Sequence, residues 1–168
     1  MNLINWYAVL VSSLIPMVVG AVWYHPKVMG NAWMKASGTT QEQIEGSNMA
    51  LIFGLAWLMS LFISALLIPM VIHQTHVFST LLSEPGIRDK NSEIYKYLMT
   101  FMKNYGGNFR TFKHGALHGA ISGVLFVTPI IATISLFERR GWRYILIHAG
   151  YWVISLTLMG GLICGWTP

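Results

Sequence analysis

The second half of the chain contains a long apolar stretch, GALHGAISGVLFVTPIIATISLF, at Gly115–Phe137. No Asp, Glu, Lys or Arg interrupts it, and roughly 20 helical residues cross a bilayer core of about 30 Å. Three other stretches have the same character: Leu3–Trp23, Met49–Ile72 and Tyr144–Trp166. A helix satisfies its own backbone polar groups in lipid, and no pattern of short alternating strands predicts a closed barrel. We therefore predict an all-α fold, a four-transmembrane-helix bundle in which residues 1–168 form a single integral membrane domain.

The composition of the whole chain supports a membrane location. Of the 168 residues, 54% are apolar and only 10% are charged, whereas a soluble domain carries about a quarter charged residues. The 11 basic and 6 acidic residues give a net charge of +5, but the basic residues lie in short segments between the apolar stretches. Such segments are typical of loops that anchor a membrane protein, and they argue against a nucleic-acid partner. The lipid bilayer is the partner that the composition predicts.

Sequence motifs that carry catalytic chemistry are missing. The chain contains no nucleophile motif, phosphate-binding loop, dinucleotide fingerprint or pair of catalytic carboxylates. We therefore expect a protein that is not an enzyme, and no cofactor is predicted.

The short loops indicate how the chain is oriented in the membrane. Four spans place both termini on the same side, and the loop Glu138–Arg143, ERRGWR, carries three arginines in a very short connection. Short loops rich in arginine usually remain in the cytoplasm. We therefore expect an integral protein of the bacterial cytoplasmic (inner) membrane with both termini outside.

The long loop between the second and third spans predicts an additional helix over residues 92–105. Its apolar residues recur at helical spacing, Ser92 or Asn91 can cap its start, and Gly106-Gly107 can end it. The stripe consists of Ile94, Tyr97, Leu98, Phe101, Met102 and Tyr105. Such an amphipathic helix either lies in the membrane interface or over the end of the bundle, or it presents its apolar face to a protein partner.

Small residues repeat within the last two spans. Gly115, Gly119 and Gly123 stand at every fourth position of the third span, and Gly161 and Gly165 repeat the spacing in the fourth. In lipid, helices associate through close backbone approach, so these ladders predict tight helix crossings. The predicted crossing joins two helices of one chain, or it joins helices of two copies in a homo-oligomer. The first alternative requires no second molecule.

Prolines interrupt three of the four spans, at Pro16, Pro69 and Pro129. Each proline frees a carbonyl oxygen that a nearby hydroxyl must satisfy. Four hydroxyl residues stand close to them in sequence: Ser12, Ser13, Ser64 and Thr128.

Histidines gather at the ends of the second and third spans. His114 and His118 are four residues apart on one face of the third span, and His73 and His76 follow the second. Four imidazoles at one membrane depth could bind a metal ion or a haem, since imidazole is a common ligand of both. The alternative is that these histidines only mark the level of the lipid headgroups.

Four polar residues should meet at the opposite membrane surface: Tyr24, His25, Glu138 and His148. His148 lies about one turn inside the fourth span, and an ionisable residue in a span is a candidate functional residue with a polar partner. Glu138 and His25 are the partners that the sequence suggests. The cluster would relay protons or bind a cation, or it would be a structural hydrogen-bond network that joins three helices.

Several motifs of aromatic, glycine and proline residues resemble a known family. They are Trp23-Tyr24-His25-Pro26, Gly30-Asn31-Ala32-Trp33-Met34-Lys35, Leu136-Phe137-Glu138, His148-Ala149-Gly150-Tyr151-Trp152 and Met159-Gly160. The chain is similar here to domain of unknown function 1761, a family of small bacterial and fungal four-helix membrane proteins. The family pattern has Asn where His148 stands, and its second loop is shorter. The resemblance implies the fold and supplies no mechanism.

Three functions remain open at this point. The first is a non-enzymatic membrane protein that acts through helix association, as a homo-oligomer or as an accessory subunit of a membrane complex. The second is a small channel or transporter for protons, a cation or a small solute. The third is a membrane protein that binds haem or a metal ion.

Overall fold

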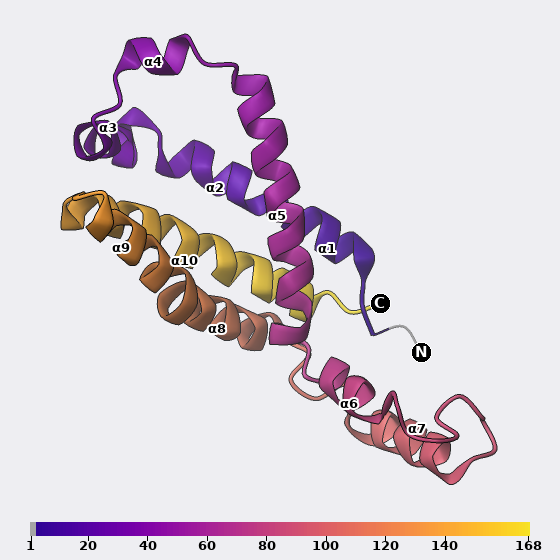
Figure 1. The fold of residues 1–168 in the computed structure, drawn as a ribbon. Helices are drawn as coiled ribbons and strands as arrows, with labels where there is room; N and C mark the ends of the chain where they lie inside the picture. The colour runs from indigo at the N-terminus through magenta and orange to yellow at the C-terminus, as the bar shows by residue number, and fades with distance from the viewer. Residues whose placement is uncertain (1–2) are drawn as a thin grey trace.

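The computed structural model describes residues 3–168, and its regular structure is helical throughout this range (Figure 1). Four helical segments within it are long and apolar enough to cross a membrane, which confirms the predicted helical fold class. They run over Trp6–Trp23, Met49–Val71, Phe112–Phe137 and Trp142–Gly165. The last two begin slightly earlier than predicted and so include one basic residue each, Lys113 and Arg143, in their first turns.

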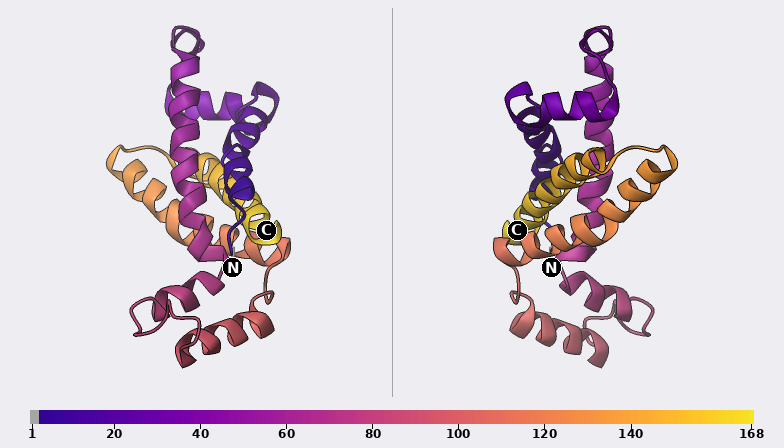
Figure 2. Two further views of the ribbon diagram at one scale, coloured as in Figure 1. Left: turned by 90° about the vertical axis from the view of Figure 1, so that its right-hand side faces the viewer. Right: turned by 90° about the vertical axis from the view of Figure 1, so that its left-hand side faces the viewer.

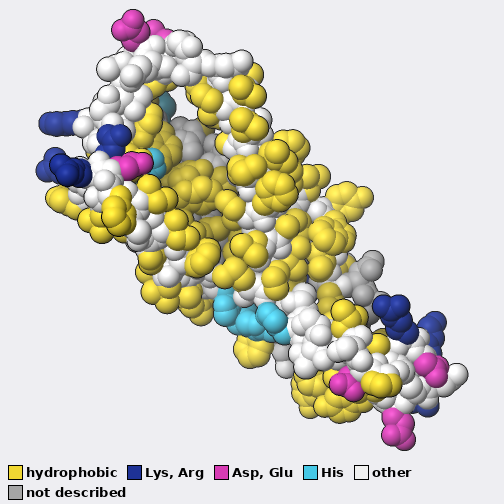
Figure 3. Space-filling view, viewed as in Figure 1, with side chains coloured by type: hydrophobic (Ala, Val, Ile, Leu, Met, Phe, Trp, Pro, Cys, Tyr) yellow, Lys and Arg dark blue, Asp and Glu magenta, His cyan; other side chains and the backbone are white. Residues whose placement is uncertain are grey.

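The distribution of side chains follows the division into spans and loops. Hydrophobic side chains cover the middle of the molecule, and the charged side chains gather at its two ends (Figure 3). The first described residues and the C-terminal residues lie near each other, and the Asn5 amide donates a hydrogen bond to the Thr167 carbonyl oxygen at 3.4 Å (Figure 1). This proximity agrees with a chain that crosses a membrane an even number of times.

Two of the spans consist of more than one helical piece. In chain order these pieces are α1 (Trp6–Ser12), α2 (Ile15–Trp23), α8 (Phe112–Ser122), the π-helical turn η2 (Gly123–Val127) and α9 (Thr128–Phe137). Pro16 stands in the first turn of α2 and Pro129 in that of α9. A proline has no N–H to donate and its ring crowds the preceding turn, so the helix breaks or bends there. The Gly123 carbonyl oxygen accepts both the Thr128 N–H and the Thr128 hydroxyl, the latter at 2.8 Å.

The tightest contact in the fold joins α8 to α10 (Trp142–Gly165). A Cβ atom on Gly119 would overlap the backbone of Leu156, and one on Gly115 would overlap the Gly160 carbonyl oxygen. The ladder of Gly115, Gly119 and Gly123 therefore faces α10 of the same chain. On α10, Gly161 and Gly165 lie against Phe112, the first residue of α8.

The core lies where α1, α10 and the second half of α5 (Met49–Val71) meet. Its buried residues are Val9, Leu67, Ile68, Val71, Ile72, Leu156, Met159, Ile163 and Cys164. The Ser12 and Ser64 hydroxyls hydrogen-bond each other between α1 and α5, and Ser64 also donates to the Val9 carbonyl oxygen at 2.7 Å. Hydroxyl pairs of this kind hold helices together where lipid offers no partner.

The first half of α5 stands away from the other spans (Figure 1). Every residue from Met49 to Met59 is exposed, whereas Ser60, Ser64 and Leu67 further along are buried. The segment that leads into α5 contains the turn η1 (Pro26–Gly30) and the short helices α3 (Asn31–Ser37) and α4 (Gln41–Glu45). This segment bridges the gap between the end of α2 and the start of α5.

The long second loop forms a limb that projects from the end of the bundle near the termini (Figure 2). It consists of α6 (Gln74–Leu81) and α7 (Glu93–Tyr105). The Ser92 side chain accepts a hydrogen bond from the Tyr95 N–H, and Gly106 follows the last residue of α7. A helix therefore occupies the predicted segment, while its location in the membrane interface stays a prediction.

Candidate functional site

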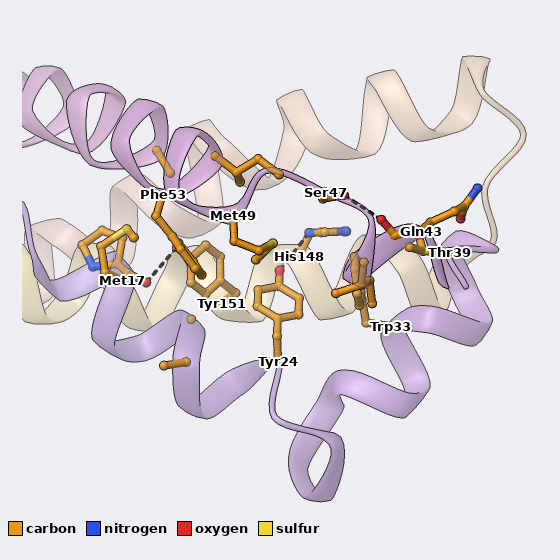
Figure 4. Close-up of a pocket in the computed structure, with 16 residues that line it drawn as sticks. Met17, Tyr24, Trp33, Thr39, Gln43, Ser47, Met49, Phe53, His148 and Tyr151 are labelled. Atoms are coloured by element: carbon orange, nitrogen blue, oxygen red, sulfur yellow. Dashed lines mark hydrogen bonds between the residues drawn. The ribbon is translucent and has the colours of Figure 1, made fainter. Parts of the chain in front are cut away.

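A cavity of about 680 Å³ lies between α2, α10, the first half of α5 and the bridging segment (Figure 4). It exists because α5 diverges from α2 and α10 before the bridging segment closes the end. The hollow is visible between hydrophobic side chains below α4 (Figure 3). Cavities of roughly 300–1,000 Å³ are typical of sites for small organic ligands.

The polar side chains that line the cavity are concentrated towards one end of it. The part nearer the middle of the spans is lined by Pro16, Met17, Ala21, Ile52, Phe53 and Ala56. The part nearer the loops adds polar side chains, those of Tyr24, Thr39, Gln43, Ser47 and His148, to the apolar Trp33, Ile44 and Met49. Since α2 rises about 1.5 Å per residue, Pro16 and Tyr24 are separated by roughly 12 Å along the helix. No Asp, Glu, Lys or Arg lines the cavity within residues 3–168.

Tyr24 and His148 form the polar centre of this lining. The Tyr24 hydroxyl and His148 Nδ1 are 2.9 Å apart, a hydrogen-bonding distance. The other ring nitrogen, His148 Nε2, is buried and has no hydrogen-bond partner among the described residues. Burial raises the pKa of Tyr24 well above its usual range, and the nearby Tyr151 and Tyr144 hydroxyls add to the shift. The neutral phenol therefore keeps the proton that it can donate to His148.

Aromatic side chains hold the wall formed by α2 against α10. The Trp23 indole N–H donates to the Ile147 carbonyl oxygen at 3.0 Å, and the Tyr151 hydroxyl donates to the Pro16 carbonyl oxygen at 3.0 Å. The Tyr24 ring packs edge-on against Trp33 with a centroid separation of 5.6 Å. Sequence reasoning from charge and spacing did not single out Trp33 or Tyr151, although both belong to the motifs that carry the family resemblance.

The structure divides the four polar residues that the sequence grouped at this membrane surface. Tyr24 and His148 meet, but Glu138 lies 3.6 Å from Arg140 in an exposed ion pair. His25 is exposed, and its Nδ1 accepts a hydrogen bond from the Lys27 N–H at 3.2 Å. In the described part of the chain, neither Glu138 nor His25 forms a hydrogen bond with His148. The Glu–His pair that the sequence suggested is therefore not directly hydrogen-bonded.

At the opposite end of the bundle, three of the four candidate metal-binding histidines come together. Nitrogen atoms of His73, His114 and His118 all lie within 4.8 Å of one another. The Nε2 atoms of His73 and His114 are 2.9 Å apart. His76 is exposed on α6 and is not part of this group. The group lies at the surface where the hydrophobic middle meets the limb, as the cyan patch in Figure 3 shows.

The apolar stripe of α7 is only partly accessible. Leu98 and Met102 are buried, and Ile94 and Phe101 are half-buried. Tyr97 and Tyr105 remain exposed. The limb therefore covers much of the face that the sequence offered as a membrane or partner surface.

Taken with the fold, these sites define a helical protein with four segments able to span a membrane and an uncharged cavity among them. Over residues 7–164, nearly its whole length, the chain matches the family described as "Protein of unknown function (DUF1761)", and it belongs to that family. No curated protein and no solved structure matches it.

Proposed function

We propose that this protein is a non-enzymatic integral membrane protein that binds an uncharged amphiphile in the cavity between α2, α5 and α10. The polar head of the occupant would lie at Tyr24 and His148, and its apolar tail would lie along α2 and α5. We place the protein in the bacterial cytoplasmic membrane with both termini outside, because the arginine-rich loop between α9 and α10 favours the cytoplasm.

The observation that carries the proposal is the hydrogen-bonded pair of Tyr24 and His148 in the lining of a cavity, with His148 Nε2 buried beside it and unpaired among the described residues. Leaving a buried polar atom without a partner costs about 1–3 kcal/mol. When the neutral Tyr24 phenol donates to Nδ1, the imidazole carries its proton on Nε2 and is a free donor. After a side-chain shift that opens Nε2 to the cavity, a carbonyl or hydroxyl oxygen of a ligand would accept this proton and remove the cost.

The charge and shape of the lining support the class of ligand. A lining without Asp, Glu, Lys or Arg offers no counter-charge to an ionic headgroup, and burying an unpaired charge is expensive. The apolar part of the lining suits a hydrocarbon chain, because cavities that bind organic ligands are lined mostly by apolar side chains with a few polar groups that fix the orientation. An uncharged amphiphile with an oxygen in its head meets both conditions.

Filling the cavity should remove its occupant. Ala56 lines the cavity, so Ala56→Trp is expected to lower the amount of co-purified amphiphile at least about tenfold. Leu51 is on the same helix, is 57% exposed and does not line the cavity, so Leu51→Trp should change nothing. Organic extracts and native mass spectra of the protein in mild detergent measure the bound amphiphile.

Loss of one hydrogen bond should have a smaller effect than filling the cavity. Tyr24→Phe keeps the ring but removes the hydroxyl that orients His148, so binding should weaken about fivefold. Wild-type protein that releases no amphiphile, or equal amounts from Ala56→Trp and Leu51→Trp, would overturn the proposal.

The exposed half of α5 favours a second candidate function, association with another membrane protein or a second copy. Met49 to Met59 form an apolar helix segment that the rest of the chain leaves exposed, and within it Ala50 and Gly54 stand four residues apart, a small-residue spacing through which membrane helices approach closely. By the helical repeat, Leu58 faces away from the cavity residues Ile52 and Ala56.

Cysteine cross-linking tests this second candidate. In a Cys164→Ser background, Leu58→Cys is expected to give a disulfide-linked dimer in native membranes. Leu136→Cys, on the 69% exposed Leu136 of α9, is the matched control and should stay monomeric. Equal cross-linking at both positions would indicate random collision and would remove this candidate.

A further inference from the structure

We propose that His73, His114 and His118 bind one divalent transition-metal ion of the Zn²⁺ class at the end of the bundle opposite the amphiphile cavity. This site does not depend on the proposed function, because it shares no residue with the cavity.

The geometry of the three imidazoles fits a single ion. Zinc binds histidine nitrogens at about 2.0–2.1 Å in tetrahedral geometry, which places two such nitrogens roughly 3.3 Å apart. The Nε2 atoms of His73 and His114 are 2.9 Å apart, and all three candidate ligand nitrogens lie within 4.8 Å of one another. To hold one ion, the pair at 2.9 Å must open by about 0.4 Å and a pair as far apart as 4.8 Å must close by about 1.5 Å, which side-chain rotations can supply.

The backbone holds two of the ligands on a rigid element. His114 and His118 lie one turn apart on α8, so their side chains project from the same face. The Thr111 hydroxyl caps this helix by accepting a hydrogen bond from the His114 N–H at 3.2 Å. Gly115 and Gly119 alternate with the histidines and pack against α10, which leaves little freedom for α8 to move.

The third ligand comes from the junction between α5 and α6. His73 follows Ile72, which is fully buried, and precedes Gln74. The Gln74 amide donates to the Asn108 carbonyl oxygen at 2.8 Å and so fixes the junction beside α8. Pairs of ligands from one helix and a single ligand from another element are a common arrangement in zinc sites with three protein ligands.

The surroundings leave room for a fourth ligand. His73 is exposed while His114 and His118 are half-buried, so an ion can arrive from water and keep a water molecule or an exogenous ligand in its open position. The group contains no Asp, Glu or Cys within residues 3–168. Three neutral imidazoles leave the charge of the ion at +2, which favours an anionic or water-derived fourth ligand.

Metal titration of the full-length protein tests the proposal. The protein is purified in mild detergent with a tag that contains no histidine, stripped with a chelator and titrated with Zn²⁺ by calorimetry. We expect one ion per chain. When Co²⁺ replaces Zn²⁺, we expect the intense visible absorption of a tetrahedral Co²⁺ complex. Histidines that only hydrogen-bond to each other and do not bind the ion would leave Co²⁺ without this absorption.

Variants separate this site from the other histidines. His73→Ala, at an exposed position, and His118→Ala should each weaken Zn²⁺ binding by at least about 100-fold. Loss of a residue that only supports a metal ligand weakens binding by about 10–100-fold, so loss of a ligand itself should weaken it at least as much. His76→Ala is the matched control, because His76 is three residues from His73 but outside the group; it should bind like the wild type. Thermal unfolding without metal checks that each variant is folded.

The results that would overturn the proposal are equally distinct. Absence of saturable binding to the wild type would show that the three histidines form only a hydrogen-bonded cluster. Binding that survives both His73→Ala and His118→Ala, or that is lost in His76→Ala, would place the metal elsewhere.

Discussion

Gly119→Ala is expected to destabilise the folded protein by about 3 kcal/mol, the upper end of the usual cost of overpacking. The added Cβ would overlap the carbonyl group of Leu156 on α10 and approach the Thr157 Cα atom to 3.0 Å. These atoms are backbone, so no side-chain rotation relieves the overlap and the two helices must separate. Thermal unfolding in mild detergent, followed by circular dichroism, measures the loss.

Two other glycines supply a graded control for this prediction. Gly54 lies within α5 and has nothing within 4 Å of the position of an added Cβ, so Gly54→Ala should be neutral or slightly stabilising through helix propensity. An added Cβ on Gly150 would meet the Trp23 ring at 2.9 Å, and because a side chain can shift, Gly150→Ala should fall between the two. If Gly119→Ala and Gly54→Ala had equal midpoints of thermal unfolding, this result would contradict the tight crossing of α8 and α10.

Arg110→Met is expected to cost about 2 kcal/mol of stability, since hydrogen bonds from a charged donor are worth roughly 1.5–3 kcal/mol. Arg110 Nη1 donates to the Leu3 carbonyl oxygen at 2.8 Å, and Nε donates to the Cys164 carbonyl oxygen at 3.2 Å. Cys164 lies in the last turn of α10, where carbonyl groups have no partner within the helix and where a cation is favourable. One side chain thus connects the limb, the start of the chain and the end of α10.

The matched control is Arg88→Met, which removes the same charge from an exposed loop of the limb. Methionine keeps an apolar stem at both positions, so the difference between the two variants isolates the hydrogen bonds of Arg110. This difference in stability is measured by chemical unfolding and by the protease sensitivity of residues near the chain termini. If both variants unfold at the same midpoint, the guanidinium of Arg110 does not hold these segments together.

The spans and α7 were predictable because strong local constraints define them. Lipid requires a minimum length of uncharged helix, and the four apolar stretches meet it. The helix at Glu93–Tyr105 agrees closely with the predicted residues 92–105, because a serine cap, an apolar stripe and a pair of glycines all indicate the same bounds. The small-residue repeat of α8 likewise indicated which face would meet another helix.

The partner of His148 was not predictable in the same way, because it depends on how separate segments meet. Glu138 follows α9 in sequence, but Arg139 adopts a positive φ of 56° and turns the loop. Arg140 then donates to the Ser37 carbonyl oxygen at 2.6 Å, which draws the loop towards α3. An acidic side chain that pairs with arginine at the surface avoids the desolvation that burial beside His148 would require.

The position of His76 and the existence of the cavity also depend on how separate segments meet, and so the sequence did not predict them. The spacing of His73 and His76 suggested a common site, but α6 begins between them and carries His76 away from α8. The cavity arises from the divergence of α5, which follows from the length of the bridging segment and not from any local pattern. Sequence reasoning could name Tyr24 and His148 as polar residues near one membrane surface, but not the hollow that they line.

The unequal exposure of the spans has a consequence for biogenesis. Over an 18-residue window, the second span has the highest mean hydropathy, 2.5, with 22% of that window buried, whereas the fourth span has the lowest, 1.6, with 39% of its window buried. Transfer of the second span into lipid is the most favourable of the four by hydropathy, so we expect this span to enter the bilayer without contact with another span. The fourth gains less from lipid and packs against the glycine surface of α8, so we expect its insertion to depend more on contact with the third span.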